Sequence, residues 1–292
     1  MKLKFTKLVP SIALLCLVWA SCQKNAADTS KPPTQTGSPL TRTTTMIGAM
    51  KNESDLEVAD IFATSEADAS HCPVTTYNPA RDVYPTIRTV DYGTGCTDDY
   101  GVTRKGKRYT TMYADKYKAP AGKVVSVTTF SNYYVNDVSV SGNVKISIAS
   151  PASSGSLVLR IVVNKTITDA FGNTSSYVNF VTQTQIAGGE TDSTKDNVFK
   201  IAENAFGTEV SGDSAMVTWK SVTDPANPII KMSGCPFRSQ GAQKITMKQL
   251  GVTTDEYLDY GNGDCDNQAT LSINGGTPQP VTLPIFLFGE DL

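Results

Sequence analysis

The sequence is poor in histidine and in charged residues. Its 292 residues include one His and two Trp, and only 18% of them are Asp, Glu, Lys or Arg. One histidine excludes metal sites and proton relays that need two imidazoles. With 26 basic against 28 acidic residues, the net charge of -2 excludes the strongly basic surface typical of nucleic-acid-binding proteins. The 39% of apolar residues can still fill the core of one large domain or two small ones.

Long hydrophobic runs are absent except near the N-terminus. A basic start is followed by an apolar stretch at 8–20, which is too short for a permanent membrane span. Ala20 and Ser21 stand directly before Cys22, and small residues before a cysteine at this place resemble the lipobox of bacterial lipoproteins. In such proteins the cysteine carries acyl chains such as palmitate and becomes the first residue of the mature chain. We therefore predict a signal peptide at residues 1–21 and lipidation of Cys22, with an ordinary secretory signal as the alternative.

A polar segment and one short helix are expected next. Residues 22–50 consist largely of small polar residues and proline, a composition that buries too little apolar surface to order itself, so we predict a flexible tether. Ser54 and Glu57 have the spacing of a capping box, and apolar residues follow at helical intervals. We therefore predict a short helix at 51–70, which ends before Pro73.

After the helix, apolar residues alternate with polar ones. In 138–148 the apolar side chains occupy even positions, and in 157–163 they occupy odd positions. Clusters of Gly, Asn, Asp and Pro separate these runs, as in antiparallel sheets with one buried face. We therefore predict an all-β domain at 71–292 with an antiparallel, β-sandwich-like architecture. Whether it is one domain or two pseudo-repeated halves, 71–150 and 151–292, stays open.

The sequence contains an internal repeat that ends in cysteines. Each unit begins with Cys-Pro and continues to Asp-Tyr-Gly-x-Gly and a second cysteine, and the two units start at Cys72 and Cys235. The glycines suit a tight turn that needs positive φ. With Cys16 removed and Cys22 acylated, four cysteines remain, and three pairings are open to them. In an exported chain the repeat favours one disulfide inside each unit, Cys72–Cys96 and Cys235–Cys265.

The second turn carries four weak candidates for oxygen ligands of Ca²⁺: Asp259, Asn262, Asp264 and Asp266. The spacing of the last three begins like a calcium-binding loop. The glutamate expected at the twelfth position is replaced by Ile273, and Asp and Asn are ordinary residues of tight turns. Turn formation is therefore the favoured interpretation, and no other metal or cofactor is predicted.

Aromatic residues gather in one stretch of the predicted sheet. Four of them are candidates for a platform that binds sugar rings: Tyr109, Tyr113, Tyr133 and Tyr134. Aromatic residues are also common in ordinary strands, where alternation buries about half of them. Carbohydrate binding is therefore an alternative function and not the first expectation.

A basic cluster surrounds a glycine in the same region. It comprises Arg104, Lys105, Gly106, Lys107 and Arg108. We expect a solvated hairpin tip with a turn at the glycine. Binding of a polyanion, such as lipopolysaccharide or an acidic glycan, is the alternative.

Motifs of nucleophilic catalysis are missing. The sequence has no Gly-x-Ser-x-Gly, and its lone His71 stands beside a predicted disulfide. A glycosidase that uses two carboxylates needs no histidine, and it stays an alternative. Because the acidic residues cluster in predicted turns and nothing marks a pair among them, we expect a protein that is not an enzyme.

The two Asp-Tyr-Gly-x-Gly units belong to longer stretches at 90–107 and 235–267, and a third stretch of interest lies at 131–138. Together these stretches resemble a widespread group of Bacteroidetes outer-membrane lipoproteins of unknown function. The resemblance extends over about 61–283. It implies a lipoprotein of β type at the outer membrane, and it implies no activity and no catalytic residues.

These observations lead to a functional expectation. We expect a lipid-anchored protein of the cell envelope that acts as a structural or binding module at the outer membrane. Its expected partners are the membrane, through the lipid anchor, and a glycan or another envelope protein; nucleic acid is not among them. A carbohydrate-binding surface lipoprotein is the alternative, and a two-carboxylate glycosidase is less favoured. Whether the domain faces the periplasm or the exterior stays open.

Overall fold

The alternating stretches of the sequence form long antiparallel strands. The structure, a computed structural model, describes residues 39–59, 61–62, 72–189, 196–210 and 216–284. The strands are β1 (Val74–Asn78), β2 (Thr86–Asp91), β3 (Cys96–Thr97), β4 (Thr103–Met112), β5 (Val124–Val135), β6 (Val138–Ser150), β7 (Val158–Thr168), β8 (Thr174–Ala187), β9 (Val198–Val210), β10 (Met216–Thr223), β11 (Ile229–Met232), β12 (Gln240–Gln249), β13 (Val252–Asn262), β14 (Gln268–Ile273) and β15 (Gln279–Thr282). A turn of 3₁₀ helix, η1 (Ala152–Ser154), lies between β6 and β7.

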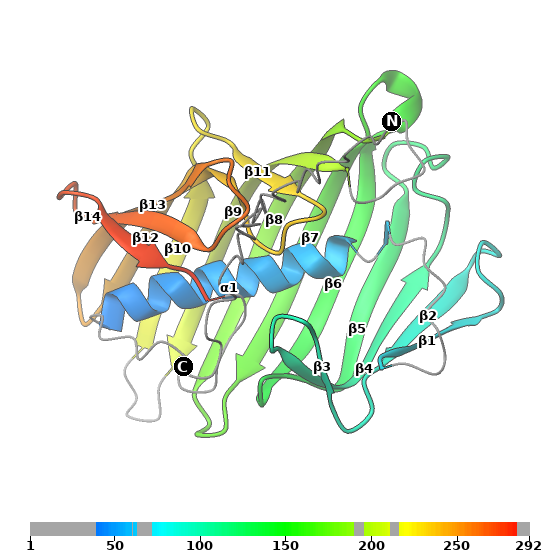
Figure 1. Ribbon diagram of the computed structural model, residues 1–292, viewed down its shortest axis with the longest axis horizontal. Helices are drawn as coiled ribbons and strands as arrows, with labels where there is room; N and C mark the ends of the chain where they lie inside the picture. The colour runs from blue at the N-terminus through cyan, green and yellow to red at the C-terminus, as the bar shows by residue number, and fades with distance from the viewer. Residues whose placement is uncertain (1–38, 60, 63–71, 190–195, 211–215, 285–292) are drawn as a thin grey trace, which may run out of the picture. The chain divides into compact units, whose positions relative to one another are not determined.

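The strands belong to one hydrogen-bonded sheet (Figure 1). Neighbours run β1-β2-β4-β5-β6-β7-β8-β9-β10-β12-β13-β14-β15, with β3 beside β4 and β11 beside both β9 and β12. The antiparallel all-β class is thereby confirmed. In a β-sandwich, the buried face of one sheet meets a second layer of strands. A twisted sheet of this many strands curls, and its inner face packs on helix α1 (Pro39–Ala59) instead.

Helix α1 differs from the helix expected at 51–70, because it occupies Pro39–Ala59 and so includes part of the segment expected as a tether at 22–50. Residues 60 and 63–70 lie outside the described part of the chain. The threonines of the first half have weak intrinsic helix propensity. Burial stabilises the helix there, since Met46 and Ile47 are at most 1% exposed. Ser54, which was expected as an N-cap, donates to the Met50 carbonyl within the helix.

The core lies between α1 and the inner face of the sheet. The alternation noted in the sequence sets this face: Ile146 and Ile148 of β6, and Leu159 and Ile161 of β7, are each at most 2% exposed. Their polar neighbours along the strands point to the outer face, as the two-residue period of a strand requires.

Both predicted disulfides are present, Cys72–Cys96 and Cys235–Cys265. Each closes a hairpin and the turn that follows it. The first unit comprises β1, β2 and the turn before β3, and the second comprises β12, β13 and the turn before β14. In each turn the aspartate accepts a backbone hydrogen bond two residues on: Asp91 from Gly93 at 2.8 Å and Asp259 from Gly261 at 2.9 Å. The repeat is therefore a structural repeat, and its two units lie in distant parts of the sheet order.

The strands before and after residue 150, β6 and β7, are hydrogen-bonded neighbours in the sheet. Residues 35–292 form one unit, and β6 pairs with β7 from Ser139 opposite Thr168 to Ser150 opposite Val158. The boundary considered between 71–150 and 151–292 therefore falls between two paired strands. In the described part of the chain, no helix combines the length and the apolar character that a membrane crossing requires.

A buried charge cluster as the candidate functional site

Helix α1 carries four charged side chains into the interior. Lys51, Glu53, Asp55 and Glu57 are each between 1% and 9% exposed. Side chains four residues apart share one face of a helix. Lys51 and Asp55 therefore point to one side of the helix axis, and Glu53 and Glu57 point to another. Each pair meets charged side chains from different strands.

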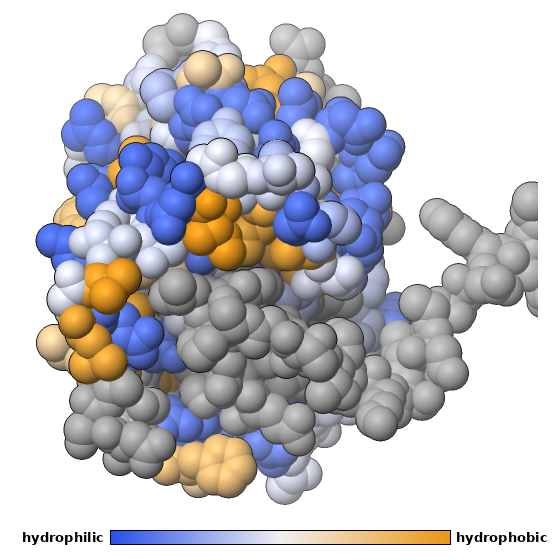
Figure 2. Space-filling model, turned by 90° about the vertical axis from the view of Figure 1, so that its left-hand side faces the viewer, coloured by the Kyte–Doolittle hydropathy of each residue, from blue (hydrophilic) through white to orange (hydrophobic). Residues whose placement is uncertain are grey.

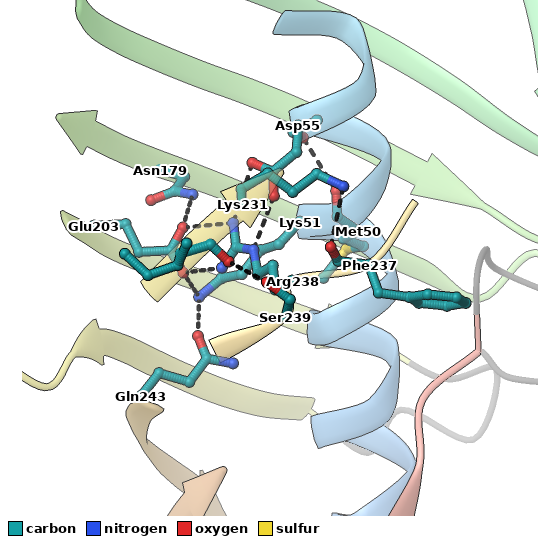
Figure 3. A network of polar contacts seen from close by, with 12 residues as sticks. Met50, Lys51, Asp55, Asn179, Glu203, Lys231, Phe237, Arg238, Ser239 and Gln243 are labelled. Atoms are coloured by element: carbon teal, nitrogen blue, oxygen red, sulfur yellow. Dashed lines mark hydrogen bonds and ion pairs between the residues drawn. The ribbon is translucent and has the colours of Figure 1, made fainter. Parts of the chain in front are cut away.

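The first group, which we call the central cluster, consists of Lys51, Asp55, Glu203 and Arg238 (Figure 3). Arg238 follows the Cys235-Pro236 motif, and its guanidinium donates to two carboxylates. Its Nε lies 2.8 Å from Asp55 Oδ2, and its Nη1 and Nη2 lie 2.7 and 3.1 Å from the two oxygens of Glu203. Lys51 Nζ lies 2.7 Å from Glu203 Oε1. Arg238 and Glu203 thus hold Asp55 and Lys51 of the helix through ion pairs.

Neutral side chains complete the hydrogen bonds of the central cluster. Lys51 Nζ also donates to Ser221 Oγ and Gln243 Oε1, each at 2.7 Å. Asn179 Nδ2 donates to Glu203 Oε2 at 3.0 Å. These partners come from β8, β10 and β12, so the cluster connects α1 to the middle of the sheet. Satisfying the polar atoms in this way is what allows charges to remain buried.

In the central cluster, burial and the attraction between opposite charges act in opposite directions on the pKa values of Glu203 and Lys51. Burial alone would raise the pKa of Glu203, but attraction by Arg238 and Lys51 outweighs it and holds that pKa well below its ordinary value. Burial lowers the pKa of Lys51 to about 8, against the opposing attraction of Glu203. By formal charge, the two basic and two acidic side chains of the central cluster sum to zero.

The second group, called the second cluster, consists of Glu53, Glu57, Arg104 and Lys165. Arg104 Nη2 lies 3.1 Å from Glu53 Oε2, and Tyr133 Oη donates to Glu53 Oε1 at 3.0 Å. Lys165 Nζ lies 2.6 Å from Glu57 Oε2. Burial would raise the pKa of Glu53, but Arg104 and Lys165 outweigh it and lower that pKa. Attraction by Glu57 likewise outweighs the burial of Lys165 and raises its pKa.

The tyrosines of the internal repeat pack on arginines that face the helix. The guanidinium of Arg108 lies 5.6 Å from the ring centre of Tyr92, and that of Arg238 lies 5.9 Å from the ring centre of Tyr260. Both tyrosines are buried. An arginine over an aromatic ring is stabilised by the electrons of the ring face. The Asp-Tyr-Gly repeat therefore supports the arginines on the inner face of the sheet.

The N-terminal half of α1 meets two acidic residues. Thr43 Oγ1 donates to Glu209 Oε2 at 3.2 Å, and Thr44 Oγ1 donates to Glu256 Oε2. Glu256 is 1% exposed, and its other oxygen has no hydrogen-bond partner among the described residues. Burial raises the pKa of Glu256 to about 7. This carboxyl group therefore titrates near neutral pH.

The second cluster has little free space around it. The hollow beside Glu53 and Lys165 has a volume of about 10 Å³, which is about enough for one water molecule. A glycosidase needs two carboxylates on either side of a sugar ring. The carboxylates of α1 face basic side chains across close contacts instead, so this arrangement disfavours glycoside hydrolysis and acts to hold the helix on the sheet.

The tyrosine platform considered as an alternative in the sequence does not include Tyr133. That residue is 1% exposed and bonds to Glu53, whereas Tyr134 is 37% exposed. Adjacent residues of a strand point to opposite faces, so Tyr133 and Tyr134 cannot share a surface. Tyr113 is exposed just after β4, and Tyr109 is half-buried on β4. The four side chains do not form one platform.

The basic cluster at 104–108 is also placed differently from the prediction. It lies within β4 and not at a hairpin tip. Arg104 and Arg108 are buried on the inner face, while Lys105 and Lys107 are partly exposed. Gly106 lies at an irregularity of the pairing between β4 and β5. Its φ is +78°, and a Cβ there would come within 1.8 Å of the Asn132 carbonyl oxygen. Alternation along a strand thus divides the cluster between two faces.

The four calcium candidates line an open hollow of about 610 Å³ at the second turn. Asp259 and Asp266 each accept a backbone hydrogen bond inside that turn, from Gly261 and Gln268. In the described ranges, no group of three or more His, Cys, Asp or Glu residues is arranged to hold a metal ion. The aspartates are thus used as turn residues, and Asn262 and Asp264 complete the rim of the hollow.

Sequence reasoning missed both clusters, although one signal for them was present. Lys165 and Glu203 occupy inward positions in strands whose other inward residues are largely apolar, such as Ile161 and Ile201. A charge in the inward register implies a buried partner. The partners on α1 were not recognisable, because that segment was expected to be a tether and a helix in a different position.

Comparison with protein-family models, curated proteins and solved structures found no match for this chain. Cys22, the predicted lipidation site, and His71 lie outside the described residues.

Proposed function

We propose that this protein is a lipid-anchored binding module of the bacterial cell envelope and not an enzyme, held at the outer membrane by acyl chains on Cys22. The observation that carries the proposal is the burial of α1 in the folded domain. The helix begins at Pro39, 17 positions after Cys22. The chain between them can extend over at most about 60 Å. In sequence, the proposed anchor therefore stands 17 positions before a helix that belongs to the core.

The two charge clusters support a mechanical role for this connection. A helix held only by apolar contacts could slide along or rotate on the sheet. Ion pairs with fixed partners, such as Arg238 between Asp55 and Glu203, specify one position and one direction of the helix. The ion pairs thus fix α1, the helix that follows the proposed anchor in sequence, on the sheet.

The surface supports a role in binding more than one in catalysis. Arg104, Lys165, Glu203 and Arg238 of the inner face pair with α1, so we infer that the outer face of the sheet is what the domain offers to a partner. On the side drawn in Figure 2, hydrophobic residues form small groups among hydrophilic ones, as expected of a surface in water.

Metabolic labelling with palmitate tests the proposal. Expressed in a bacterium with two membranes, the wild-type protein is expected to incorporate palmitate and to fractionate with the outer membrane. Cys22→Ser is expected to abolish the label and to release the domain from that fraction. Cys16→Ser, which changes the other cysteine of the N-terminal segment, is the matched control and should keep both properties. Label or membrane retention in Cys22→Ser equal to wild type would refute the anchor.

A further inference from the structure

The outer face of five neighbouring strands is free of acidic side chains. In β6, β7, β8, β9 and β10 the acidic residues are Glu203 and Glu209, and both point to α1. Four basic side chains of these strands are exposed on the outer face: Lys145, Arg160, Lys200 and Lys220. None of the four has an ion pair with another described residue. In a chain with more acidic than basic residues, this face is a positively charged region.

Two exposed phenylalanines lie at the centre of this face. Phe180 of β8 and Phe206 of β9 are 49% and 46% exposed, and their ring centres are 6.1 Å apart. Large aromatic side chains left half in water on a regular sheet mark a contact surface. Isolated exposed apolar residues are common, but a ring pair surrounded by cations is a specific arrangement.

Strand pairing places polar side chains directly beside the rings. Phe180 is opposite Asn204, which is opposite Val222, and Phe206 is opposite Lys220. A hollow of about 470 Å³ opens beside Phe180, and Lys200, Asn204 and Val222 are among the residues that line it. The face therefore combines aromatic surface, an amide and two ammonium groups within neighbouring rungs of the sheet.

We propose that the outer face of β6 to β10 binds an anionic polysaccharide, with Phe180, Phe206, Asn204, Lys200 and Lys220 as the central contacts. This inference rests on the proposed binding function and names its ligand class. The apolar face of a sugar ring stacks on an aromatic side chain, and hydroxyl groups accept or donate hydrogen bonds to an amide. The carboxylate or sulfate groups of the polymer meet the lysines, whose charge is complementary.

The composition of the face favours a glycan over a membrane. Most of its outward side chains on β7 and β8 are hydroxyls or amides, such as Asn164, Thr182 and Thr184. Contact with lipid would remove water from these groups without replacing their hydrogen bonds, which is unfavourable. A polysaccharide replaces those hydrogen bonds with its own hydroxyl groups. An anionic membrane is therefore the competing outcome of the test and not the ligand proposed.

Binding measurements with defined polymers test this inference. The mature chain without its lipid, residues 23–292, is titrated with polygalacturonate and with chondroitin sulfate. Methyl-esterified polygalacturonate, which has the same sugar without the charge, is the matched control ligand. Saturable binding to at least one anionic polymer is expected, weaker by at least tenfold for the methyl ester and weakened by salt.

Variants assign the binding to this face. Phe180→Ala/Phe206→Ala is expected to lower the affinity at least tenfold, and Lys200→Gln/Lys220→Gln is expected to reduce the dependence on salt. Tyr113→Ala/Tyr134→Ala, which changes two other exposed aromatic residues, is the control and should bind as wild type. Thermal unfolding verifies that each variant is folded.

Several outcomes would overturn the inference. These are the absence of binding to either anionic polymer, equal binding by the phenylalanine variant, or binding only to vesicles with anionic lipids. They would leave the lipid anchor untouched, because palmitate labelling of Cys22 tests that separately. Conversely, a chain that binds polygalacturonate but carries no acyl group would keep the glycan site and lose the anchor.

Discussion

Removing single charges from the central cluster gives the sharpest energetic prediction. Lys51→Met leaves a net charge of -1 in this buried site, and Asp55→Asn leaves +1. The double variant leaves Arg238 paired with Glu203 through two hydrogen bonds at 2.7 and 3.1 Å, with no net charge. The energetic cost should therefore follow the charge balance and not the number of contacts removed.

The expected magnitudes follow from the burial of the site. The side chains of Lys51 and Glu203 are 1% and 0% exposed, and removing one partner of such a pair costs about 3–5 kcal/mol of unfolding free energy. Each single variant should lose about that much. Residues in one network couple by about 0.5–3 kcal/mol, so the double variant should lose less than the sum of the two single losses by about 1–3 kcal/mol.

Urea unfolding of residues 23–292 at pH 7, with both disulfides intact, measures these losses. Lys244→Met is the matched control, since Lys244 and Asp255 form an ion pair in which the side chains are 60% and 46% exposed. Exposed pairs contribute about 0–1 kcal/mol, so this variant should stay close to wild type. Additive losses for Lys51→Met and Asp55→Asn, or single losses as small as that of Lys244→Met, would refute the reasoning.

Three further predictions concern pH, a disulfide and a glycine. The folded protein holds the proton of Glu256 more tightly than the unfolded chain does, with a pKa of about 7 against 4.5. The free energy of unfolding should therefore fall by up to about 3 kcal/mol as the pH rises from 4.5 to 7. Glu256→Gln should reduce this pH dependence, as measured by urea unfolding at pH 5 and pH 8. Replacing both Cys235 and Cys265 by serine should cost about 3–4 kcal/mol by loop entropy, measured by thermal and urea unfolding; an unchanged midpoint would contradict it. Gly106→Ala should cost at least about 1–3 kcal/mol, because its Cβ would overlap the Asn132 carbonyl, and a melting temperature equal to wild type would show that the bulge can relax.

The sequence predicted the strands well because their signal is local. Alternation in 138–148 and 157–163 depends only on which face of a strand is buried, and the burial of β6 and β7 follows it. The disulfides could be predicted because the repeat sets each cysteine pair in one unit. How the strands curl around a helix is decided by contacts far apart in the chain, and no local pattern shows it.

The candidate site was hidden for a related physical reason. Helix α1 is stabilised by tertiary contacts and not by its own propensity, so its threonine-rich start is typical of a tether when considered alone. Lys51 meets a carboxylate that is 152 positions away in the sequence. Tyr133 and Tyr134 show what composition alone does not predict. The composition identifies an aromatic stretch, but the register of β5 places the two rings on opposite faces of the sheet.

Native-state hydrogen exchange of α1 tests the central claim most directly, namely that the segment after the proposed lipid anchor is a buried helix and part of the core. We predict that backbone amides of residues 46–57 exchange only when the whole domain unfolds, with the same free energy of opening as amides of β7 and β8. Exchange of these amides at the rate of an unstructured peptide, while β7 and β8 stay protected, would contradict the account.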